Sequence, residues 1–233
     1  MRLMEEGDLV EDMTVRSCFD TIEISGWEGA IRGMRNPLNS WAKHDSSYKS
    51  EYEYMIGDND MKLAKTLISS GPEHCKFLRM IHVQVNVDMP RYWWSEADTY
   101  HFGTKNSCST MHRLLNNTNP ITEDMFLVCE EDKDVLAVVI ARLEALRIKY
   151  KEIQKNYTGT DKQERLDYLL LRAKRILPEG FYQMRTWDTS YAELRNIYHQ
   201  RKHHRLKEEW QDKFCMWIET LPYAKELIIG EDV

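Results

Sequence analysis

The stretch "MIHVQVNVDMP", residues 80–90, constrains the fold more than any other part of the chain. Apolar and polar side chains alternate along it, and its apolar face carries Ile81, Val83, Val85 and Val87. A period of two places these side chains on one side of an extended strand, with the polar ones on the other. The stretch therefore predicts a β-strand that packs one face on a core and ends at Pro90.

Other stretches predict a second strand and several helices. "DTIEIS", residues 20–25, alternates polar and apolar side chains, and the region after it begins with a short helix and continues as a polar loop. Apolar residues at helical spacing predict helices over residues 58–71 and 134–153. Few strands and several long helices predict an α+β fold, in which a small antiparallel or mixed sheet is covered by long helices. We expect a single domain over residues 1–233.

Two capping boxes predict where the last helices begin. Thr160 with Gln163 predicts a helix running to about Arg175. Ser190 with Glu193 predicts a longer amphipathic helix that continues towards residue 217.

Composition excludes several classes of protein. A net charge of −6 argues against binding nucleic-acid polymers, which usually requires a basic balance. The five cysteines are scattered and form no C-x-x-C pair, as is typical of a reducing compartment. The acidic stretch "MRLMEEGDLVEDM" has no apolar core of a signal peptide, and no apolar run reaches about 20 residues, the length of a membrane span. We therefore expect a cytoplasmic protein that does not contact membranes.

The stretch "TYHFGTKNSCSTMHR", residues 99–113, is dense in side chains that hold phosphates and nucleobases. It follows the predicted buried strand, as a ligand-binding loop often does. Residues 32–46, "RGMRNPLNSWAKHDS", form a second polar loop, whose Arg, Lys and Asn side chains favour anion binding.

Residues 99–111 resemble the signature R-H-R-x-x-S-x-N-x-x-S-x-R of flavin-dependent thymidylate synthases. Thr104 stands for the first Ser of that signature, and Asn106 and Ser109 match it. The R-H-R triplet is replaced by "TYH", ending in His101, and the closing Arg is Met111.

Residues 173–210 resemble the same family more closely. Lys174 precedes a "LP" turn, and Asn196 and Arg201 follow at the family's spacing, five residues apart on a predicted helix. Ser190 replaces the family's first helix Asn, and Arg205 replaces its His. The resemblance is strongest over residues 60–225.

The resemblance implies a homotetramer that binds FAD and dUMP at subunit interfaces. In the family reaction, methylenetetrahydrofolate supplies a one-carbon unit to uracil C5 and NADPH supplies reducing equivalents. Residue by residue, the resemblance implies nucleotide binding by Thr104, Ser109, Lys174 and Arg201, and cofactor binding by His74, His101, Asn106, Ser190 and Asn196. It assigns no catalytic residue, because reduced flavin supplies the hydride.

Three functions remain open from the sequence. The first is a divergent flavin-dependent C5 transferase acting on dUMP or a related nucleotide. The second is a protein that binds the nucleotide without catalysis, to sequester or sense it. The third is a helical scaffold without a ligand. His199 and His203 lie one helical turn apart and suit zinc, but no Cys cluster accompanies them, so we expect no metal site.

Overall fold

An antiparallel sheet of four strands forms the centre of the protein in a computed structural model, which describes residues 17–51 and 53–230. Its order is β1 (Phe19–Ser25), β4 (His82–Pro90), β6 (Tyr182–Ser190) and β5 (Thr104–Ser107), and each neighbouring pair is antiparallel. A two-stranded ribbon, β2 (Ser47–Tyr48) and β3 (Tyr54–Met55), lies apart from it. The α+β class predicted from the sequence is confirmed.

Strand β4 is central and has the predicted alternation. Val83, Val85 and Val87 have no exposed surface, whereas His82 at the start of the strand is exposed. Transferring apolar surface from water to the core stabilises the fold by about 25 cal/mol per Å². This burial fixes which face of the sheet carries the helices, because a shift of one residue in register would expose every valine.

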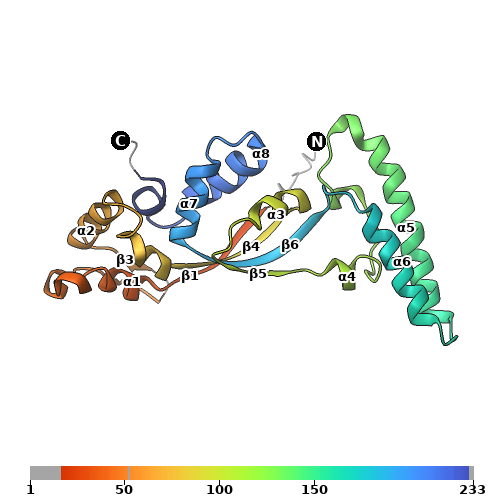
Figure 1. The fold of residues 1–233 in the computed structure, drawn as a ribbon, viewed down its shortest axis with the longest axis horizontal. Helices are drawn as coiled ribbons and strands as arrows, with labels where there is room; N and C mark the ends of the chain where they lie inside the picture. Colours follow the sequence, from red (N-terminus) through yellow and green to blue (C-terminus); the bar gives the residue numbers. More distant parts are fainter. Residues whose placement is uncertain (1–16, 52, 231–233) are drawn as a thin grey trace, which may run out of the picture.

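The helices fall into two groups (Figure 1). Those around the sheet are α1 (Trp27–Gly33), α2 (Asp58–Ser69), α3 (Arg91–Ala97), α7 (Tyr191–Arg201), α8 (Lys207–Glu209) and α9 (Met216–Glu219). Short 3-10 turns span Asn36–Leu38, Trp41–Lys43, Cys75–Met80, Glu123–Met125 and Glu130–Asp132, and π turns span Trp210–Cys215 and Lys225–Ile229. The long helices α5 (Lys133–Asn156) and α6 (Lys162–Ile176) pack on each other as an arm at one end of the sheet. The short helix α4 (Thr110–Arg113) follows β5 and lies beside the arm (Figure 1). None of the helices in the described ranges is long and apolar enough to cross a membrane.

Aromatic side chains fill the space between the sheet and its helices. Trp93 on α3 lies 4.8 Å from Trp210, measured between ring centroids, and 4.9 Å from Trp94. Trp187 on β6 stacks on Phe214. Trp93 and Trp94 are both fully buried, so they belong to the core.

The arm has a separate apolar core. Leu143 and Leu146 of α5 pack with Leu169, Leu170 and Ala173 of α6, and this cluster does not merge with the core of the sheet. The predicted helix over residues 134–153 is thereby confirmed, because its apolar stripe faces α6.

Two sequence predictions about helix ends need correction. Helix α6 begins after Asp161 rather than at a Thr160 capping box, and the Asp161 carboxylate accepts hydrogen bonds from Tyr157 and Arg165 instead of capping the helix. Helix α7 does begin with the predicted bond, from the Glu193 backbone N–H to Ser190 Oγ, but it ends at Arg201 instead of continuing towards residue 217. Residues 199–205 carry no apolar side chain that would hold a further turn of helix on the core.

A buried carboxylate, Asp60, fixes the polar loop of residues 32–46. Asp60 has no exposed surface and accepts hydrogen bonds from Arg35 Nε at 2.5 Å, from Ser46 Oγ at 2.5 Å and from the Asp45 and Ser46 backbone N–H groups at 3.1 Å. Burial raises the pKa of Asp60, but the hydrogen bonds from Ser46, the Asp45 backbone and Arg35 together outweigh it and hold the pKa below its usual range. Arg35 is therefore paired with Asp60 inside the fold. The anion binding predicted for the loop would depend on the loop's other polar side chains.

We expect Asp60→Asn to lower the free energy of unfolding by about 3–5 kcal/mol, because it leaves the buried Arg35 charge without its partner. Urea unfolding measures this change. Glu53→Gln is the control, since Glu53 forms an exposed pair with Lys49, and it should cost less than about 1 kcal/mol. Equal losses of unfolding free energy in Asp60→Asn and Glu53→Gln would contradict this role.

The contribution of Asp60 to stability depends on pH. Because the folded-state pKa of Asp60 is lowered, this contribution is present above the unfolded-state pKa and is lost as pH falls through the folded-state value.

Candidate functional site

A cavity of about 850 Å³ opens at the end of the sheet where β4 begins and β6 runs into α7. The pairing of the strands brings four of its lining residues together, because His82 lies opposite Ser190 and Asp188 lies opposite Thr104. Three residues predicted from the sequence line it: Thr104, Ser190 and Asn196. They come from β5, β6 and α7, so the fold brings together groups that are far apart in the chain.

Arg and His side chains line the same cavity from elements outside the signature. Arg79 lies in the 3-10 turn Cys75–Met80, and Arg195 and His199 lie one turn apart on α7. Arg195 donates a hydrogen bond to the Ile228 carbonyl at 2.6 Å, and burial lowers its pKa. Sequence reasoning did not select Arg79 or Arg195 for this site. The only local signal was the position of Arg195, one turn before His199 and directly before Asn196.

Two carboxyl groups also line the cavity. Asp188 Oδ1 lies 3.2 Å from His82 Nδ1, and both side chains are about half exposed. Glu193 is 6% exposed. Burial raises the pKa of Glu193, and hydrogen bonds from Asn196 and the Phe102 backbone partly oppose that effect.

One buried hydroxyl on the cavity wall lacks a hydrogen-bond partner. Thr189 is 2% exposed, and its Oγ1 makes no hydrogen bond to any residue that the structure describes. An unsatisfied buried hydroxyl costs free energy unless a ligand or water pairs with it. The cavity thus has an apolar wall, cations, carboxyl groups and an unused polar group, which is the composition of a small-molecule site.

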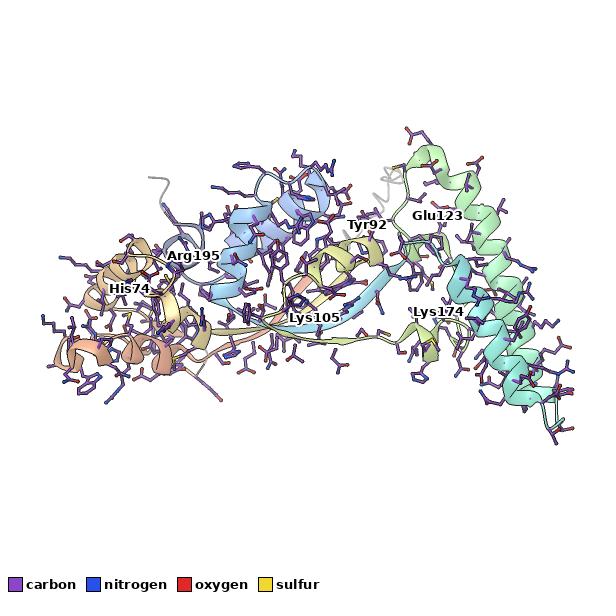
Figure 2. The ribbon with its side chains drawn as sticks, in the orientation of Figure 1. His74, Tyr92, Lys105, Glu123, Lys174 and Arg195 are labelled. Carbon is purple, nitrogen blue, oxygen red and sulfur yellow. The ribbon has the colours of Figure 1, made fainter. Side chains whose placement is uncertain are left out.

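Two other predicted nucleotide-binding residues, Ser109 and Lys174, lie at the opposite end of β5. Lys174 Nζ donates to Thr110 Oγ1 at 2.6 Å, and burial, with a contribution from Arg91, lowers the pKa of Lys174. Thr110 and Ser109 line a smaller cavity of about 230 Å³. Lys174 lies on α6 of the arm, and Figure 2 shows Arg195 towards the opposite end of the sheet. One copy of the chain therefore does not bring the two groups of predicted residues together.

Three predicted cofactor-binding residues lie outside the large cavity. His74 is half exposed, and its Nε2 lies 3.5 Å from Glu73. Asn106 is exposed on β5 opposite Thr186. His101 is exposed beside Phe102, close enough to influence the pKa of Glu193. Their roles stay predictions.

Arg201 lies in an internal ion pair. Its Nη1 is 2.8 Å from Glu96 Oε2, its Nε donates to Tyr100 Oη at 2.8 Å, and its guanidinium lies over the Trp210 ring at 4.4 Å. Trp210 Nε1 donates to the same Glu96 oxygen. The predicted contact of Arg201 with a nucleotide would need this network to open, and it stays a prediction.

We expect Arg201→Ala to lower the free energy of unfolding by about 1.5–3 kcal/mol, because Glu96 loses a charged hydrogen bond. Urea unfolding provides the measurement. Arg205→Ala, which removes an exposed charge nearby, is the matched control and should change stability by less than about 0.5 kcal/mol. If both variants unfold at the same urea concentration as the unmodified protein, the Glu96 network does not support the fold.

Solved structures show which known fold this is. The chain superposes on flavin-dependent thymidylate synthase from Helicobacter pylori complexed with FAD and dUMP, with a TM-score of 0.63 and 17% sequence identity over 90% of this chain and 97% of the other. A second structure of that enzyme with FAD and dUMP gives a TM-score of 0.62 at 17% identity, over 90% and 95% of the two chains. No protein-family model and no curated protein sequence matches the chain. The protein has the fold of flavin-dependent thymidylate synthase, with a divergent sequence.

Proposed function

We propose that the protein binds a pyrimidine deoxynucleoside monophosphate together with FAD and transfers a one-carbon unit to C5 of dUMP or a related nucleotide. The observation that carries this proposal is the large cavity, where Thr104, Ser190 and Asn196 converge in a fold shared with an enzyme solved with FAD and dUMP. Methylenetetrahydrofolate and NADPH are the co-substrates that the family reaction requires.

The charges of the cavity fit a phosphorylated ligand. A phosphate monoester carries about −1.5 to −2 charge at neutral pH, and a pyrophosphate also needs cationic partners. Arg79 and Arg195 line the cavity although the Arg residues of the signature are missing. The Thr189 hydroxyl, which has no partner in the described ranges, offers one further contact. The residues present therefore fit a flavin nucleotide.

The chain's own contribution is binding and orientation. Bound flavin supplies the hydride chemistry that the protein's side chains lack. Arg79 and Arg195 would hold phosphate oxygens, because guanidinium groups pair with them through two hydrogen bonds. Asn196 would orient a ring through its amide. Ser190 Oγ already accepts the hydrogen bond that caps α7.

A second copy of the chain would complete the site. Ser109 and Lys174 lie at the other end of β5 from the large cavity, so a nucleotide that contacts both groups must sit between two subunits. The outer face of α5 supports such an assembly, because Val135, Val138 and Ile148 are each more than half exposed. We propose the homotetramer implied by the family resemblance.

One observation favours a second candidate, a nucleotide-binding protein without catalysis. Arg201 is held by Glu96, and the exposed Met111 stands where the signature has an Arg. Both features leave fewer cations to hold an anionic substrate in place for reaction.

The visible absorbance of the purified protein, followed by calorimetry with dUMP, tests the proposal. Bound flavin together with dUMP-dependent NADPH oxidation supports the enzyme. Binding of dUMP without flavin supports the sequestering protein, and binding of neither ligand contradicts both.

We expect Arg79→Ala to weaken FAD binding about tenfold or more, because a charged hydrogen bond to phosphate is worth about 1.5–3 kcal/mol. Flavin fluorescence titration measures the change. Lys225→Ala removes an exposed charge elsewhere at the same end of the molecule and should leave FAD affinity unchanged. Unaltered FAD affinity in Arg79→Ala would place the phosphates away from this Arg.

We expect light scattering to show a tetramer at micromolar concentration. Val138→Glu should shift it to a smaller species, because it places a charge within an apolar contact. Lys155→Glu changes an exposed side chain near the end of the same helix and should leave the mass unchanged. A monomeric unmodified protein would argue against a site shared between subunits.

A further inference from the structure

The buried carboxyl group of Glu193 has an unusual position for a side chain on the wall of a large cavity. It lies in the first turn of α7 and is 6% exposed. The groups that donate hydrogen bonds to it are neutral, namely the Phe102 backbone N–H and the Asn196 side chain. Within the described part of the chain, no Lys, Arg or His makes an ion pair with Glu193.

Charged groups around Glu193 are engaged with other partners or lie further away. Lys105 on β5 lowers the pKa of Glu193, but its Nζ donates to the Ala97 and Tyr100 carbonyls at 3.0 Å each and lies 3.5 Å from Asp98. His101, in the loop before β5, also lowers the pKa of Glu193. The other titratable groups that line the cavity, from the 3-10 turn, β4, β6 and α7, are Cys75, Arg79, His82, Asp188, Arg195 and His199.

Burial without a cationic partner favours the uncharged form of a carboxyl group. An unpaired charge in such a place is costly, so the group binds a proton instead. In accordance with this, burial raises the pKa of Glu193 and is the largest influence on it. A neutral carboxyl group presents an O–H donor beside a carbonyl acceptor. That pair is complementary to a ring N–H beside a ring carbonyl.

We propose that Glu193 determines ligand specificity by recognising an imide edge, the ring N–H between two carbonyls that uracil nucleotides and the flavin ring share. Glu193 accepts the ring N–H and donates its own O–H to a neighbouring carbonyl. Asn196 and the Phe102 backbone hold the carboxyl group in place. This inference rests on the proposed function, because it concerns a ligand in the same cavity. The part of the ligand that Glu193 recognises is the imide edge of its ring.

The imide edge has two possible sources, and binding measurements with matched probes separate them. The probes are dUMP and its N3-methyl derivative, and riboflavin 5′-phosphate and its N3-methyl derivative. Methylation at N3 removes the hydrogen-bond donor and leaves the carbonyls in place. The ring whose affinity falls on methylation is the one that Glu193 contacts.

Two substitutions separate the role of Glu193 from its burial. Glu193→Gln keeps one donor beside one acceptor and should retain the affinity of the unmodified protein. Glu193→Ala removes both and should weaken binding about tenfold, in keeping with the loss of hydrogen bonds to the ligand. Glu226→Gln, at a partly exposed position on the π turn Lys225–Ile229 that packs against α7, is the control and should change nothing.

The pH dependence follows from the protonated form. Affinity should be full below the pKa of Glu193 and fall as pH rises through that pKa, because the carboxylate can still accept the ring N–H but has lost the O–H donor. Glu193→Gln should remove this decrease, because the amide keeps its donor and its acceptor at every pH. Comparing the two proteins therefore isolates the contribution of Glu193.

The outcomes are distinguishable. If neither dUMP nor riboflavin 5′-phosphate binds the unmodified protein at any pH, the proposed function fails and this inference fails with it. If either binds, but its N3-methyl derivative binds equally well, the inference is overturned while the proposed function stands. This comparison uses the unmodified protein, so it holds even if Glu193→Ala does not fold. Equal losses in Glu193→Gln and Glu193→Ala would also overturn the inference.

Discussion

The antiparallel pairing of β4 with β6 is the constraint on which the rest of the structure depends. Nine residue pairs join the two strands, from His82 with Ser190 to Pro90 with Tyr182. Burial of the valines of β4 fixes the register, because a slip of one residue would bring polar side chains into the aromatic core. The same register places His82, Asp188 and Ser190 together at one end of the ladder and directs the chain into α7. The cavity is thus a consequence of how the core packs.

Sequence reasoning recovered the parts of this arrangement that have local signals. The alternation around Val85 predicted β4, and the Ser190–Glu193 pair predicted the start of α7. It did not recover Arg79 or Arg195, because their presence in one cavity depends on how a 3-10 turn packs against a helix more than 100 residues away in sequence. The Arg201–Glu96 pair was missed for the same reason. The prediction placed the end of α7 too late, because residues 199–205 are all polar and give no local signal for where the helix stops.

The distribution of charge differs from what the signature alone suggests. Loss of the R-H-R triplet and of the closing Arg implies a less cationic site, yet Arg79, Arg195 and two His residues line the cavity from other elements. Meanwhile Lys105, which lies inside the altered signature, stabilises the loop before β5 through three contacts. Positive charge is therefore present at the site, but it is supplied by different parts of the chain.

The separate core of the arm has a consequence for how the protein folds and diversifies. Because α5 and α6 bury their leucines against each other, they form a cooperative unit whose local opening need not disturb the aromatic core. Hydrogen exchange in the arm can then follow its own free energy of opening. Insertions or deletions near the tip of the hairpin, around Gly159, would lengthen or shorten the arm while the register of β4 and β6 stays fixed. Such a separation lets one half of the molecule vary its contacts with partners while the other half keeps its cavity.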